Sequence, residues 1–64
     1  MEIKATEKNA FLIKKDDVIY LIKKEYITGT LIYNYFIYES KDYNCLGDFS
    51  TLDEAIEAIQ NGNI

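Results

Sequence analysis

The chain contains no histidine, arginine, proline or tryptophan, and its single cysteine is Cys45. Without histidine, no side chain has an ordinary pKa near neutral pH, and the usual base that activates a catalytic serine or cysteine is missing. Without arginine, the chain has no guanidinium group to donate two parallel hydrogen bonds to a phosphate or a guanine. One cysteine excludes an internal disulfide and a zinc site made of cysteines. We therefore expect no enzyme activity, no metal and no cofactor.

Long apolar runs are also missing. The longest, Val18–Ile22, is far shorter than the roughly 20 residues needed to span a bilayer. Residues 1–9 are polar, and no apolar segment follows a basic start, so we expect no signal peptide and no membrane association. A lone cysteine fits a reducing compartment, and the sequence therefore predicts a cytoplasmic protein.

The residues that are present favour one folded domain, residues 1–64. Of these, 48% are hydrophobic, and nine are aromatic, six of them tyrosine, whereas disordered chains are poor in aromatic residues. Half of the chain consists of Ile, Lys, Asn, Tyr, Phe and Met, whose codons are rich in A and T. That composition is typical of a low-GC genome, either bacterial or phage.

Four segments have the β-branched and aromatic content of strands: residues 11–13, 18–22, 31–38 and 43–49. Short polar corners separate the first pair and the last pair, which predicts two hairpins. Gly29 predicts a turn or bulge before the third segment. Residues 1–9 are expected to form a loose lead-in, although Ile3 and Ala5 alternate with polar residues as in a short strand.

A helix is predicted over residues 51–60. Thr51 offers an N-terminal capping hydroxyl, and Glu54 three residues later completes a capping box. One apolar stripe follows at helical spacing: Leu52, Ala55, Ile56 and Ile59. The sequence thus predicts an α+β fold, in which a small antiparallel sheet of three to four strands precedes one C-terminal helix packed on one face.

Both faces of the third predicted strand are apolar or aromatic, and a single helix covers only one of them. Three explanations remain open for the other face. The N-terminal residues shield it, the chain forms a homodimer through it, or a different molecule docks there. If the helix covers the side of Ile32 and Phe36, Tyr33 and Tyr35 lie at the centre of that interface.

Negative charge is concentrated in the C-terminal part of the chain. Residues 1–38 hold six lysines and five acidic residues, whereas residues 39–64 hold one lysine and six acidic residues, for a net charge of −5. An ordinary solvated helix surface explains this, since acidic side chains suit the first turn. The alternative is an acidic patch that docks on a basic partner. The candidate residues are Glu39, Asp42, Asp53, Glu54 and Glu57.

Residues Leu46–Ala55 read LGDFSTLDEA. This segment resembles the strand-to-helix junction of the ethylene-response-factor-type DNA-binding domain of plants and of the arm-type DNA-binding domain of tyrosine integrases. The resemblance implies a sheet packed on one helix. In those families, arginines and tryptophans on the sheet contact DNA, and this chain has neither residue type.

The sequence favours a small acidic protein-binding module without enzyme activity, such as an accessory or inhibitor protein of a phage or mobile element. Its expected partner is a protein, with a basic protein as the first candidate. The alternative is a sheet-type nucleic-acid-binding domain. A net charge of −4 opposes that alternative, because DNA binding depends on lysines and arginines that neutralise phosphates.

Overall fold

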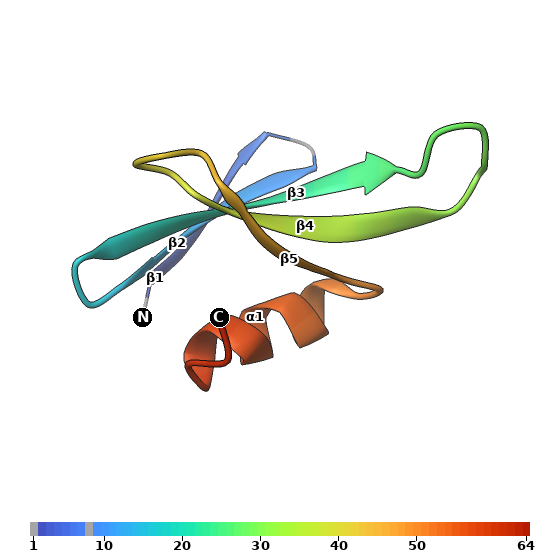
Figure 1. The fold of residues 1–64 in the computed structure, drawn as a ribbon. Helices are drawn as coiled ribbons and strands as arrows, with labels where there is room; N and C mark the ends of the chain where they lie inside the picture. The colour runs from blue at the N-terminus through green and yellow to red at the C-terminus, as the bar shows by residue number, and fades with distance from the viewer. Residues whose placement is uncertain (1, 8) are drawn as a thin grey trace.

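The computed structural model describes residues 2–7 and 9–64. It contains five strands followed by one helix: β1 Glu2–Glu7, β2 Ala10–Lys15, β3 Val18–Tyr26, β4 Tyr33–Glu39, β5 Cys45–Phe49 and α1 Leu52–Gln60. Each strand pairs antiparallel with the next one along the chain, in the order β1-β2-β3-β4-β5. The helix lies against one face of this sheet (Figure 1). The predicted α+β fold and its C-terminal helix are confirmed.

The strand count differs from the predicted three to four, because the segment expected to be a loose lead-in contains β1. Ile3 pairs with Ile13, and Ala5 pairs with Phe11. A polar segment can form an edge strand because the backbone of its neighbour supplies the hydrogen bonds. The strand limits also shift. β3 continues through Lys23 and Lys24, and β4 begins only at Tyr33.

The buried core lies between the sheet and α1. Ile13, Ile22 and Ile37 come from three neighbouring strands, and each is fully buried. Ala55 and Ile59 of α1 pack against them. The other two residues of the predicted helical stripe, Leu52 and Ile56, are partly buried and contact the same cluster. The predicted packing face of the helix is therefore confirmed.

Side-chain hydrogen bonds hold both ends of α1. At the N-terminus, the Thr51 hydroxyl accepts a hydrogen bond from the Glu54 backbone N–H at 3.2 Å, as the capping pattern predicts. At the C-terminus, the last turn contains no basic residue. Instead, the Lys15 ammonium at the end of β2 donates to the carbonyls of Ile59 and Gln60 at 2.9 and 3.0 Å. The Ile59 carbonyl also accepts from the Gly62 backbone N–H at 3.2 Å, so Lys15 adds a second donor there and supplies one to Gln60.

The β3–β4 hairpin extends past the N-terminal end of α1 (Figure 1). The molecule is accordingly elongated, with principal extents of 36 × 22 × 21 Å. In the described part of the chain, no helix is long and apolar enough to cross a membrane.

Candidate protein-binding surfaces

The helix covers the sheet face that carries Tyr35 and Ile37, not the face that carries Phe36. Tyr35 packs against the core, and Tyr33 lies on the same face near the end of the hairpin. The placement of Tyr33 and Tyr35 on the uncovered face was predicted for a helix on the side of Ile32 and Phe36, and the helix lies on the other side. Both faces of β4 are apolar, and a shift of one residue in the strand register exchanges the two faces. The sequence pattern alone therefore could not show which face the helix covers.

The opposite face of the sheet, here called the open face, carries among its half-buried side chains the large apolar or aromatic ones of Leu12, Leu21, Phe36 and Tyr38. The Tyr43 ring stacks on the Tyr38 ring with a centroid distance of 5.0 Å. The Tyr38 hydroxyl donates a hydrogen bond of 2.7 Å to the Glu25 carboxylate. That bond, together with burial, raises the pKa of Tyr38 to about 12. Aromatic and polar neighbours thus shield part of this face, and β1 widens the sheet instead of covering it.

A shallow depression lies beside the solvent-facing side of α1, and we call it the helix depression. It has a volume of about 240 Å³ and is lined by Phe49, Glu54, Glu57, Ala58, Asn61 and Asn63. Two of the predicted acidic residues, Glu54 and Glu57, therefore share one concave surface. Asp53 is exposed in the first turn of α1 but does not line the depression. Among the described residues that line it, none is a lysine.

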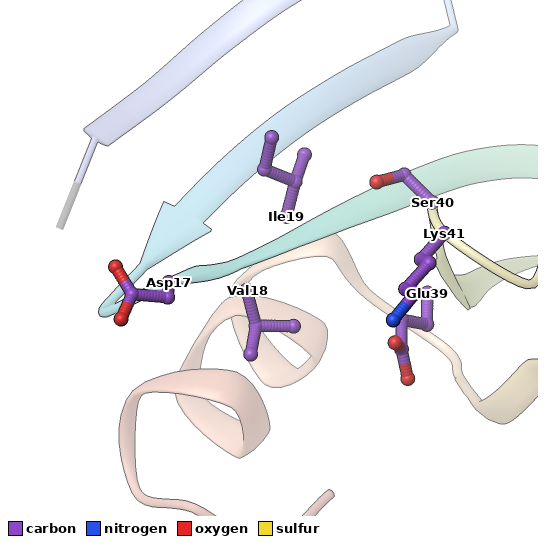
Figure 2. A pocket seen from close by; sticks show the side chains of 6 residues that line it. All are labelled: Asp17, Val18, Ile19, Glu39, Ser40 and Lys41. Atoms are coloured by element: carbon purple, nitrogen blue, oxygen red, sulfur yellow. The ribbon is translucent and has the colours of Figure 1, made fainter.

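A second hollow, of about 330 Å³, lies where the β2–β3 turn approaches the end of β4 (Figure 2). Figure 2 shows its lining, which consists of Asp17, Val18, Ile19, Glu39, Ser40 and Lys41. Glu39 therefore shares no hollow with the acidic residues of the helix, and Asp42 lines neither hollow. Because Lys41 offsets part of the negative charge here, this hollow suits a basic partner less well than the helix depression does.

Within residues 2–7 and 9–64, no group of three or more His, Cys, Asp and Glu side chains is placed to hold a metal ion. Cys45 is a free, exposed cysteine. The absence of a cofactor and of enzyme activity stays a prediction from composition.

The most exposed apolar residues lie at the end of the β3–β4 hairpin, next to Tyr33, which was predicted as a partner-binding residue; no role was predicted for the residues that precede it. Leu31 is 93% exposed, Ile32 63% and Tyr26 62%. The sequence assigned Leu31 and Ile32 to a strand because they are β-formers next to Tyr33. The signal that could have exposed the error is Gly29 within an uncharged stretch, since a turn there places the flanking apolar residues beyond the sheet.

Comparisons of the chain with protein-family models, with curated proteins and with solved structures found no match.

Proposed function

We propose that the protein is a small acidic module without enzyme activity that binds a basic protein partner through the helix depression. One observation carries this proposal. Glu54 and Glu57 face the same hollow as Phe49, within a segment whose net charge is −5. Spaced carboxylates beside an aromatic ring suit a lysine or arginine side chain.

The lining of the depression suggests how such a side chain would bind. Its aliphatic stem would lie on Phe49 and Ala58, and its charged head would reach the two carboxylates. The amides of Asn61 and Asn63 provide further hydrogen-bond acceptors at the rim. The surplus of negative charge around the site would also attract a basic partner before contact.

The setting that we propose is the cytoplasm, as an accessory or inhibitor protein of a phage or mobile element. Two features support it: the free Cys45, which fits a reducing compartment, and the large share of residues with AT-rich codons. A homodimer, which the sequence also suggests, would use a surface other than the helix depression.

A sheet-type nucleic-acid-binding domain is the second candidate, and one observation favours it. The open face carries Lys4, Lys14 and Lys23 by strand alternation, together with the aromatic rings of Phe36 and Tyr38. Aromatic rings among lysines can stack nucleic-acid bases. A gel shift at low salt separates the two candidates. At micromolar protein we expect no gel shift of duplex DNA or of single-stranded nucleic acid. A gel shift that weakens steeply as the salt concentration rises would make nucleic-acid binding the first candidate and protein binding the second.

The proposal is tested by affinity capture from the lysate of a low-GC bacterium, with mass spectrometry of the retained proteins. The test variant is Glu54→Gln/Glu57→Gln. The matched control is Asp16→Asn/Asp17→Asn, which removes the same charge at the exposed β2–β3 turn. We expect a basic protein that the wild type and the control retain and the test variant loses. If all three chains retain the same proteins, the helix depression is not the binding site.

A further inference from the structure

The end of the β3–β4 hairpin, residues 26–33, is here called the hairpin tip. Besides its three most exposed side chains, Ile27 and Tyr33 are 42% and 37% exposed. Together these five residues expose on the order of 600 Å², backbone and tyrosine hydroxyls included, which is comparable with the largest apolar patch on a typical monomer. A patch of that size at one end of an elongated molecule indicates an interaction surface.

The tip is held in one conformation by its own hydrogen bonds. The Ile27 backbone N–H donates to the Ile32 carbonyl at 2.8 Å, and the Thr30 N–H donates to the Ile27 carbonyl at 3.0 Å. The Thr30 hydroxyl donates to the Ile27 carbonyl at 2.9 Å and accepts from the Ile32 N–H at 3.1 Å. Gly29 takes the left-handed conformation that the turn requires, with φ +81°. Because these bonds already order the backbone of the tip, burial of Leu31 in an interface costs little further conformational entropy.

On the helix side of the hairpin, an aromatic cluster extends from the tip toward α1. The Tyr26–Tyr33 pair is four residues along the strands from the buried Ile22–Ile37 pair, or roughly 13 Å. The rings of Tyr26, Tyr33 and Tyr35 contact edge to face, with centroid distances of 5.7 and 5.9 Å. The Lys24 ammonium lies 3.9 Å from the Tyr33 ring centroid.

Charge favours a second copy of the chain over an anionic membrane surface. Residues 26–38 form the longest stretch of the chain without a charged side chain, although the whole chain carries −4. Two copies can therefore meet at this end with the least repulsion between their acidic segments. A membrane surface with anionic lipids would repel a chain of this net charge.

We propose that two copies of the chain associate through their hairpin tips and the aromatic faces behind them, as a two-fold dimer. In this arrangement each hairpin tip covers, in the other copy, the part of the helix-side face that extends beyond α1. A standard interface buries about 800 Å² per partner, and the tip with its uncharged threonines offers an area of that order. A two-fold dimer is the commonest closed arrangement of identical chains. The dimer uses no residue of the helix depression.

Sedimentation-equilibrium centrifugation over a dilution series tests the proposal, with circular dichroism to verify folding. The test variant is Leu31→Lys, whose side chain supports no fold contact because it is almost fully exposed. The control is Leu46→Lys, a 39%-exposed leucine in β5, away from the tip. We expect a wild-type dimer that dissociates on dilution, a dissociation constant at least about tenfold higher for Leu31→Lys, and a control like the wild type.

Two results would overturn the dimer. The first is a wild type that stays monomeric at high micromolar concentration, whether or not the tip then binds lipid vesicles or a foreign protein. The second is equal dissociation constants for Leu31→Lys and the wild type. The Glu54→Gln/Glu57→Gln variant should dimerise normally, so failure of the dimer and failure of the helix depression are separate outcomes.

Discussion

Truncation of Ile59 to alanine tests the packing of α1 on the sheet. Ile59 is 2% exposed and belongs to the cluster of Ile13, Ile22 and Ile37. Ile→Ala substitutions in protein cores cost about 2–5 kcal/mol, because they lose transfer free energy and leave a cavity. Since few atoms in so small a core can shift to fill the gap, we expect the upper half of that range.

The expected loss is large for a chain of this length. A domain of 64 residues has an unfolding free energy on the order of 3–10 kcal/mol. In a domain of this size each kcal/mol shifts the Tm by about 4–8 °C, so Ile59→Ala should lower it by more than about 14 °C or unfold the chain.

The assay is thermal and urea unfolding followed by far-UV circular dichroism. The control is Gln60→Ala, which truncates the neighbouring exposed residue of α1 and leaves its backbone carbonyl in place. The control should differ from the wild type by less than about 0.5 kcal/mol. Equal Tm values for Ile59→Ala and the wild type would refute the packing of Ile59 in the core. A Tm that falls as far in Gln60→Ala as in Ile59→Ala would refute it as well. Ile56→Ala should cost less than Ile59→Ala, because Ile56 is only partly buried.

Three smaller predictions concern single contacts. Lys15→Met should lower the free energy of unfolding by about 1 kcal/mol in a urea titration, because the Gln60 carbonyl loses its bond from Lys15 and the Ile59 carbonyl loses one of its donors. Gly29→Ala should cost about 1–2 kcal/mol in the same assay, since its positive φ is strained for alanine although no atom obstructs the added Cβ. For Tyr38, the folded pKa of about 12 lies above the ordinary value of 10, so its hydrogen bond to Glu25 stabilises the fold fully below pH 10. The stability difference between the wild type and Tyr38→Phe should therefore shrink as pH rises from about 10 to about 12.

The sequence predicted the elements whose signals are local. The helix was predictable because Thr51 and Glu54 mark its start and its apolar residues recur at helical spacing. The β2–β3 turn was predictable because Asp16 tolerates the left-handed conformation, which it adopts with φ +56°. β1 was missed because an edge strand needs no apolar face of its own, so polar residues obscure its pattern.

What the sequence could not predict depends on contacts between distant residues. The face that α1 covers is set by how Ala55 and Ile59 fit against Ile22 and Ile37, and both sides of β4 offered apolar residues. The convergence of Glu54 and Glu57 with Phe49 depends on how the helix turns back on β5. Helical spacing placed the two carboxylates near each other, but only the tertiary fold adds the aromatic ring.

The most direct test of the proposed function is an NMR titration of the ¹⁵N-labelled protein with a short lysine-rich peptide. We expect chemical-shift changes that cluster at Phe49, Glu54, Glu57 and Ala58, and that disappear in Glu54→Gln/Glu57→Gln but persist in Asp16→Asn/Asp17→Asn. Changes spread evenly over all acidic residues, or equally lost in both double variants, would show that charge alone attracts the peptide and would contradict a binding site at the helix depression.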